Sequence, residues 1–291
     1  HDDTRDKYEF PWAHTMLSVV ADFASRALND TVNNGTGDAC FVLNSPASSG
    51  YPNAETQWFA HPLDAASLAD VARVGLGLSS LLTCSAVCRN MSVGKRRIFI
   101  YRREHKRMSR RISNAHELKE GLLRDLPRAV AAAANRTRST VGRLEADVQV
   151  GDFEKRGLRP QVEEMADADV YVGTHGSESA NTVFQRPCAA FVHLMPHGVR
   201  MMGHDGNLAA EAGRLYYPWC EHQDSHWLNS PLGEPGYPCD LAVGAPTTPQ
   251  KFPTTFHASV DEVIRLVAHA LVMQSQCLAR LCGRDCPSRV H

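Results

Sequence analysis

Short apolar runs that alternate with amphipathic segments are the feature that most constrains the fold of this chain. The runs are rich in β-branched and aromatic residues, as strands are. They lie at residues 97–101, 148–150, 169–173 and 189–194. Apolar residues between them recur at helical spacing, which predicts helices over about 114–134 and 159–166 and a third just after Gly176. Strands and helices that alternate at this spacing form parallel β-α-β units, so we predict an α/β protein.

The pattern also divides the chain into two domains. Residues 1–92 contain an apolar run at 40–43 and a helix that Asp64 caps, which predicts a small α/β domain. Residues 93–291 hold the longer alternation and end in an amphipathic helix that begins at Ser259. A length of 291 residues fits one large domain or two ordinary ones.

Charge and hydropathy exclude several partners. The chain has 31 Lys and Arg against 32 Asp and Glu, so no overall field recruits nucleic acid or anionic lipid. Its longest apolar stretches, 74–87 and 129–134, are shorter than the ~20 residues of a membrane span. The chain begins with His1, and residues 1–8 lack the regions of a signal peptide. We therefore expect a processed or truncated chain, and any membrane anchor would lie outside it.

Nine cysteines and four N-glycosylation sequons favour the secretory lumen or the extracellular space over the cytosol. The sequons begin at Asn29, Asn34, Asn90 and Asn135. Cysteines cluster at positions 84 and 88, at 220 and 239, and at 277, 282 and 286. Disulfides are favoured over zinc because the close pairs have C-x3-C spacing without a matching histidine pair, so no metal site is predicted. We predict a Cys220–Cys239 disulfide that closes the proline-rich loop 218–253.

The turn after the strand 169–173 is the strongest candidate for ligand binding. Ligands of open α/β sheets bind at the carboxyl ends of strands, and a helix N-terminus offers unpaired N–H groups to an anion. His175 and Gly176 are therefore candidates to contact a phosphate, with Ser177 as the helix cap. The alternative is a tight turn that glycine merely fits. The G-x-S-x-G, P-loop and H-E-x-x-H patterns are absent, which argues against serine hydrolases, P-loop kinases and zincins.

A basic segment follows the strand 97–101. Arg102 and Arg103 end this strand, and Ser109-Arg110-Arg111 come shortly after it. Guanidinium groups gathered at one strand end are suited to bind a diphosphate. The alternative is a solvated basic surface.

Together these two segments resemble glycosyltransferase family 61, over about residues 95–217. Members carry a strand ending in Arg, then Ser-Arg-x-Ile-x-Asn and Glu-Leu, a Gln-containing helix, and Ala-Asp-Val-x-Val-Gly-x-His-Gly before an Asn, a Phe and a Pro. The matching residues are Arg102 or Arg103, Ser109 to Ile112, Asn114, Glu117 and Leu118, Gln161, Ala168 to Gly176, Asn181, Phe184 and Pro187, and Leu215 to Tyr217 resemble the tyrosine segment of the family.

The resemblance implies a GT-B-like fold of two Rossmann-like domains with parallel sheets. Residues 1–92 would form the acceptor side and residues 93–291 would bind the nucleotide sugar. It further implies an inverting transferase of the secretory pathway that moves a xylose-class or N-acetylglucosamine-class sugar from a UDP-sugar to a glycan or glycoprotein hydroxyl, without metal or cofactor. Candidates for the catalytic base are Glu55, His61 and Asp64. The expected donor-binding residues are Arg102, Arg103, Ser109, Arg110, Asn114, His175, Gly176, Ser177, Asn181 and His193.

Two positions depart from the family pattern. Glu178 places a carboxylate beside the expected diphosphate, where it would repel the ligand unless it faces solvent or pairs with an arginine. For an enzyme we expect that second geometry. His193 replaces a Glu that is expected to hold the nucleotide ribose. These departures motivate an alternative, a catalytically silent relative that serves as a carbohydrate-binding or structural subunit.

Overall fold

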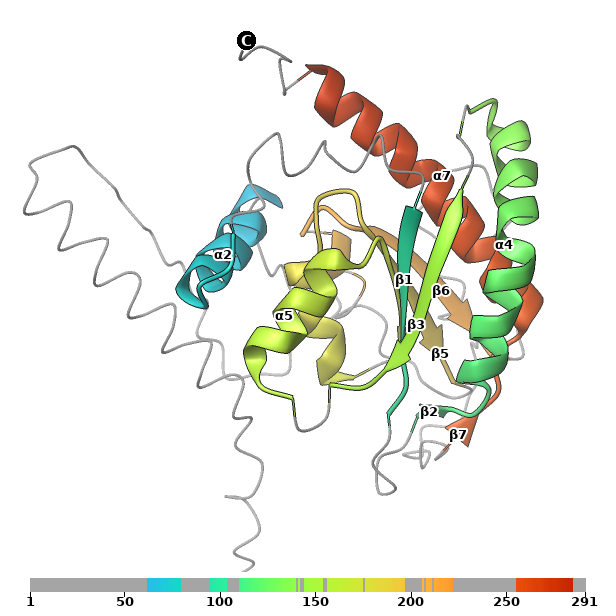
Figure 1. Ribbon diagram of the computed structural model, residues 1–291, viewed down its shortest axis with the longest axis horizontal. Helices are drawn as coiled ribbons and strands as arrows, with labels where there is room; N and C mark the ends of the chain where they lie inside the picture. Colours follow the sequence, from blue (N-terminus) through green and yellow to red (C-terminus); the bar gives the residue numbers. More distant parts are fainter. Residues whose placement is uncertain are drawn as a thin grey trace, which may run out of the picture.

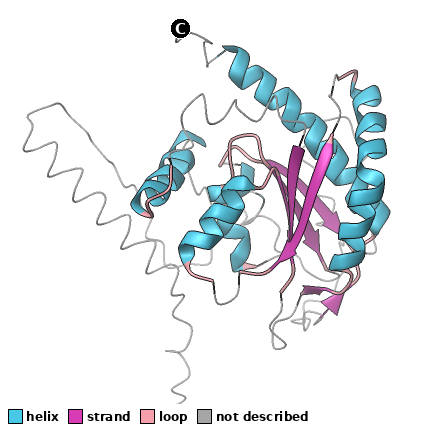
Figure 2. Cartoon of the chain, viewed as in Figure 1, coloured by secondary structure: helices cyan, strands magenta, loops and turns pink. Residues whose placement is uncertain are grey.

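The structure, a computed structural model, describes residues 62–79, 95–103, 110–153, 156–196, 206–221 and 255–284, except positions 140, 142, 143, 175, 207 and 211 (Figure 1). These residues form an α/β unit whose five-stranded parallel sheet has helices on both faces (Figure 2). The strands of this sheet are β1 (Lys95–Tyr101), β3 (Glu145–Gly151), β4 (Val170–Thr174), β5 (Ala190–Met195) and β6 (Leu215–Cys220). The helices are α2 (Pro62–Gly75), α4 (Ala115–Thr137), α5 (Leu158–Asp167), the 3-10 helix η3 (Ser177–Phe184) and α7 (Val260–Arg284). Two short parallel strands, β2 (Arg111–Ile112) and β7 (Thr255–Phe256), pair apart from the sheet.

The strand order is β3-β1-β4-β5-β6, which is the doubly wound order of flavodoxin-like sheets. After β1 the chain runs through α4 to β3, which lies at the edge of the sheet. It then returns through α5 to β4, on the other side of β1. The winding direction therefore reverses between β1 and β4. In sheets of this kind the reversal opens a crevice at the carboxyl ends of the two strands.

One face of the sheet is aliphatic and is covered by α4 and α7 (Figure 1). Side chains alternate between the two faces of a strand, so Ile98 and Ile100 of β1 share this face with Val170 and Val172 of β4. The helices contribute buried aliphatic residues at helical spacing. These are Leu118, Leu122, Leu126 and Val130 of α4, and Val263, Ile264, Leu266, Val267, Leu271 and Val272 of α7. This face forms the larger of the two main hydrophobic clusters of the described residues.

The other face is aromatic and lies against α5, η3 and α2. Its rings form a row across the strands, with centroids 5.2 Å apart for Phe99 and Phe153, 5.1 Å for Tyr171 and Phe191, and 4.9 Å for Phe191 and His193. The two faces thus differ in chemistry because aliphatic and aromatic residues alternate along the strands and point to opposite faces.

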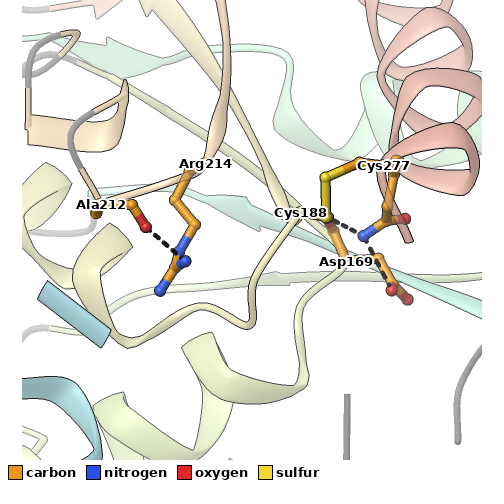
Figure 3. The surroundings of a disulfide bond; sticks show 6 residues. Asp169, Cys188, Ala212, Arg214 and Cys277 are labelled. Carbon is orange, nitrogen blue, oxygen red and sulfur yellow. Dashed lines mark hydrogen bonds between the residues drawn. A yellow bond between two sulfur atoms is a disulfide. The ribbon is translucent and has the colours of Figure 1, made fainter. Parts of the chain in front are cut away.

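The amino ends of the strands are joined around a buried carboxylate, Asp169. It accepts the amide N–H of Arg97 at 2.9 Å and a guanidinium N–H of Arg186 at 3.1 Å, and the Gln274 amide of α7 donates to it at 3.3 Å. Beside it, a disulfide links Cys188 before β5 to Cys277 of α7 (Figure 3). Side-chain chemistry therefore connects α7 to the sheet at this end.

The disulfide corrects the expected grouping of Cys277 with Cys282 and Cys286. Its partner, Cys188, is 89 residues away and is brought close only by the packing of α7 on the sheet. Cys220 and Cys282 each take part in a disulfide as well. The predicted partner of Cys220, Cys239, lies outside the described residues.

The strands and helices predicted in residues 93–291 are present with small changes at their ends. The prediction that the loop begins at residue 218 is wrong, because the unpredicted strand β6 continues through Pro218 to Cys220 at the edge of the sheet, where proline is tolerated. The helix expected after Gly176 is a 3-10 helix. The final helix begins as predicted, with the Glu262 amide donating to Ser259 Oγ at 3.5 Å. Of residues 1–92, the structure describes α2 and the turn after it, and α2 packs against η3 through Ala69 and Ala72 of the aromatic cluster. The boundary at residue 92 and a second Rossmann-like domain thus stay predictions. Among the described helices, none is both long and apolar enough to cross a bilayer.

Candidate functional site

The carboxyl ends of β1 and β4, which we call the crevice, carry three of the described residues that were predicted to bind a donor, namely Arg102, Arg103 and Gly176. Residues 98–100 of β1 pair with residues 170–172 of β4, so both strands end at the same edge. Arg102 and Arg103 follow β1, and Gly176 follows β4. The register of the sheet therefore joins the two segments that the sequence singled out.

An ion pair between Arg103 and Glu178 lies at the crevice, on the aromatic side of the sheet. Arg103 Nη2 donates to Glu178 Oε2, and the two side chains are 2% and 15% exposed. The expectation that Glu178 pairs with a nearby arginine is thus confirmed. The partner is itself one of the residues predicted to bind the donor.

Gly176 is required by this pairing. Its backbone, with φ 156° and ψ 177°, lies in a region that only glycine readily adopts. A Cβ at this position would overlap the Arg103 guanidinium. The glycine therefore lets the turn after β4 approach the end of β1.

Tyr101 lies beneath the ion pair and is fully buried. Burial, and then the negative charge of Glu178, raise the pKa of its hydroxyl far above the usual value. Tyr101 therefore stays protonated and is unsuited to act as a base. Across the crevice, the buried Thr174 hydroxyl of β4 has no hydrogen-bond partner among the described residues.

Arg102 points to the opposite face from Arg103, as neighbours at a strand end do. Its Nη1 lies 3.1 Å from Nε2 of His116, in the first turn of α4. Its amide donates to the Gly151 carbonyl at 2.8 Å and extends the pairing with β3. Arg102 and Arg103 thus lie on the two sides of the crevice.

Asn114 joins distant parts of the chain. Its Nδ2 donates to the Ala258 carbonyl at 2.8 Å and lies 3.2 Å from His257 Nε2, and its Oδ1 accepts the Ala258 amide at 3.1 Å. These bonds fix the start of α4 to the start of α7. Arg110, four residues earlier, has a left-handed backbone with φ 74° just before β2.

Two further predicted positions are buried in the fold. Asn181 Nδ2 donates to Gln161 Oε1 at 3.1 Å, which ties η3 to α5. His193 is fully buried in the aromatic row, with Nδ1 2.8 Å from the Tyr216 hydroxyl. It stacks on Phe191, because alternate residues of β5 share a face.

The remaining candidates are not placed by the structure. Glu55, His61, Ser109 and His175 lie outside the described residues. Asp64 and Ser177 were predicted to cap helices, and both predictions are wrong. The helix α2 already begins at Pro62, a residue favoured in the first helical turn, and the cap of η3 is Gly176, so both residues lie inside their helices. Only the backbone of these two residues is described. Among the described residues, no group of His, Cys, Asp or Glu is arranged to hold a metal ion.

Tyr101 and Thr174 were not predicted as site residues. Each is the last residue of its strand. Because ligands of open α/β sheets bind at the carboxyl ends of strands, the reasoning that selected the residues after these strands applies to Tyr101 and Thr174 as well. The apolar runs alone gave no reason to separate their last residues from the core.

A comparison with protein families matches residues 12–192 to the family described as Glycosyltransferase 61. The match covers more than half of the chain and reaches from well before α2 into β5. It thus includes much of the segment before residue 92, where no motif was recognised. A comparison with curated proteins gives no significant match.

Proposed function

Because this chain belongs to glycosyltransferase family 61, we propose that it is an inverting transferase that uses a UDP-sugar of the xylose or N-acetylglucosamine class. The acceptor is a hydroxyl of a glycan or glycoprotein in the secretory pathway. The observation that carries the proposal is the meeting of Arg102, Arg103 and Gly176 at the reversal point of a doubly wound sheet.

In this proposal the donor diphosphate binds at the carboxyl ends of β1 and β4. Arg102 and Arg110 supply positive charge to the leaving diphosphate, and backbone N–H groups at the start of η3 add hydrogen bonds. The pair formed by Arg103 and Glu178 is neutral as a unit. Its part is to position the turn at Gly176.

The acceptor side belongs to a first Rossmann-like domain of a GT-B-like pair. Glu55, His61 or Asp64 deprotonates the acceptor hydroxyl as the general base. The packing of α2 on η3 supports this arrangement, because α2 begins directly after His61 and η3 begins directly after Gly176. The scheme requires no metal ion or cofactor.

A second candidate function is a catalytically silent relative that binds carbohydrate or supports another protein. The observation that favours it is the Arg103–Glu178 pair, in which a carboxylate of the chain already neutralises a guanidinium of the crevice. The two candidates differ in whether the crevice binds a nucleotide.

Calorimetric titration with UDP, together with thermal unfolding, separates them. For a transferase we expect UDP at 100 times its dissociation constant to add about 2.7 kcal/mol to the free energy of unfolding. Arg110→Ala should abolish binding without lowering the melting temperature of the free protein, because its guanidinium serves the ligand. Arg128→Ala, at an exposed position of α4, is the matched control.

Absence of UDP binding to the wild type would favour the silent relative. An unchanged UDP affinity in Arg110→Ala would show that Arg110 does not contact the nucleotide. Arg102→Ala would then test whether the nucleotide binds at the crevice. Binding without sugar transfer or slow UDP-sugar hydrolysis would retain the nucleotide site but reject the catalytic role.

A further inference from the structure

One of the four N-glycosylation sequons, Asn135-Arg136-Thr137, lies within the described residues. Its three residues form the last turn of α4. The other three sequons begin outside the described residues. Asn135 is therefore the sequon asparagine whose surroundings can be examined.

Asn135 lies on the side of α4 that faces away from the sheet. Ala133 and Ala134 are buried in the aliphatic cluster, whereas Asn135 is exposed. A helical side chain covers the turn that precedes its own Cα, and here that turn presents the small, exposed side chains of Ala131 and Ala132. No large side chain of that turn therefore stands in the way of a sugar attached to the Asn135 amide.

The site is also far from the crevice. Helix α4 begins at Ala115, shortly after the residues at the end of β1, and runs back along the outside of the unit toward the start of β3 (Figure 1). A rise of 1.5 Å per residue places Asn135 about 30 Å from Ala115 along the helix axis. A glycan at Asn135 therefore leaves the crevice open to its ligands.

The hydroxyl of Thr137, which the sequon requires, is engaged in the folded protein. Its Oγ1 donates to the carbonyls of Ala133 at 3.1 Å and Ala134 at 3.2 Å, and it lies 2.9 Å from Ser139 Oγ. Ser139 Oγ in turn accepts a hydrogen bond from the Gln276 amide of α7. The third position of the sequon is thus tied to its own helix and, through Ser139, to α7.

These contacts set an order of events. A hydroxyl that is bonded to its own helix is not presented to an enzyme together with the asparagine amide. Gln276 follows Ser139 by 137 residues, so the ribosome adds it roughly 7–27 s later at typical translation rates. The sequon is therefore available in the nascent chain before α7 can fix it.

We propose that Asn135 is an N-glycosylation site and that it is modified before α7 packs on α4. In this step the amide nitrogen of Asn135 attacks the anomeric carbon of an oligosaccharide carried on a polyprenyl diphosphate. The bond from that carbon to the diphosphate oxygen breaks, and the amide nitrogen loses one proton. The proposal relies on the secretory compartment of the proposed function but not on its reaction.

Expression of the full chain behind a cleavable signal sequence in eukaryotic cells tests the site. Peptide N-glycosidase in heavy-oxygen water converts a glycosylated asparagine into a labelled aspartate, which mass spectrometry detects. Trypsin releases Asn135 in the peptide of residues 129–136, which contains no other asparagine. We expect this peptide to carry the label.

Variants of the sequon give a second readout. Asn135→Gln and Thr137→Ala should each remove one glycan, seen as one step of lower apparent mass in electrophoresis. Thr137→Ser keeps a hydroxyl and should retain the glycan, as should the control Arg128→Gln at another exposed position of α4. An unlabelled Asn135 in secreted chains whose Cys188–Cys277 disulfide has formed would overturn the proposal, whatever the result of UDP titration.

The order of events has its own test. The chain, purified without glycans, is incubated with a single-subunit oligosaccharyltransferase and a lipid-linked oligosaccharide, either folded or reduced and unfolded. We expect modification of Asn135 in the unfolded chain and at least tenfold less in the folded one. Equal modification of both would overturn the order of events.

Discussion

At the scale of single residues, Glu178 shows how a departure from the family pattern is accommodated. Its carboxylate binds Arg103 instead of facing the crevice alone. We therefore expect Glu178→Gln to change UDP affinity by no more than about threefold, or about 0.65 kcal/mol, in calorimetric titration. A tenfold gain over a wild type that binds poorly would show that Glu178 opposes the ligand, and would favour the silent relative.

Asn114 illustrates a motif residue with a structural task. Its amide group exchanges two hydrogen bonds with the backbone of Ala258. Asn114→Ala leaves a buried N–H and a buried carbonyl without partners, so it should lower the free energy of unfolding in urea by about 1–3 kcal/mol. Ser113→Ala, whose hydroxyl donates to Phe256 at a more exposed position, is the neighbouring control and should cost less. An Asn114→Ala protein of wild-type stability would contradict the structural role.

His269 gives the fold a pH dependence. Burial and then the charge of Arg136 lower its pKa below 6.5, where it packs edge-on against Tyr217. Below pH 6.5 the unfolded chain therefore takes up this proton more readily than the folded one, and stability falls with falling pH. As the pH falls below 6.5, we expect the free energy of unfolding in urea to decrease more for the wild type than for His269→Phe. Parallel pH profiles would refute this assignment.

The sequence allowed these residues to be selected but not their tasks to be assigned. Arg102, Arg103 and Gly176 were placed correctly at strand ends, because the strand pattern is local. Asn114 was predicted to bind the donor, yet its partner lies 144 residues away and no periodicity marks that contact. His193 was placed on its strand, but its burial depends on how neighbouring strands pair.

At the scale of elements, the Cys188–Cys277 disulfide fixes α7 to the connection before β5. A link across 89 residues restricts the unfolded chain strongly, so its removal should cost about 2–5 kcal/mol of unfolding free energy. We expect the double variant Cys188→Ser, Cys277→Ser to unfold at lower urea concentration than the oxidised wild type. Addition of a reductant should lower the urea midpoint of the wild type toward that of the variant. The shift that the same reductant causes in the variant measures the effect of reducing the other disulfides and serves as the control. Equal midpoints under oxidising conditions would contradict it.

Elements with a clear period were predictable, and those without one were not. The strands β1, β3, β4 and β5 and the helices α4, α5 and α7 were predicted from their apolar patterns. The strand β6 was not predicted, because Pro218 within it indicated a loop. The two-residue strands β2 and β7 are too short to show a pattern, and the hydrogen bonds between Asn114 and Ala258 lie directly beside their pairing. The 3-10 geometry of η3 was likewise missed, since apolar spacing does not separate it from an α-helix over eight residues.

At the scale of the molecule, the aliphatic face depends on α7. Several of its residues are fully buried on the sheet and on α4, including Val263, Leu266 and Val267. Each such side chain contributes about 1.5–3 kcal/mol, so their sum rivals the whole stability of an ordinary domain. A chain that ends before Val260 should therefore bind the dye ANS strongly and lose its near-ultraviolet circular dichroism. A chain that ends at Arg284 is the control, and native-like spectra from the shorter chain would contradict the prediction.

The late position of α7 in the sequence has a consequence for synthesis. The ribosome completes β5 at Met195 and must add a further 89 residues before it reaches the end of α7 at Arg284. This takes roughly 4–18 s at typical translation rates. During that interval the aliphatic side of the nascent sheet has α4 but not its second cover, and Cys188 waits for Cys277. We expect the emerging chain to need a chaperone over this window, and an oxidant that acts only after translation has passed α7.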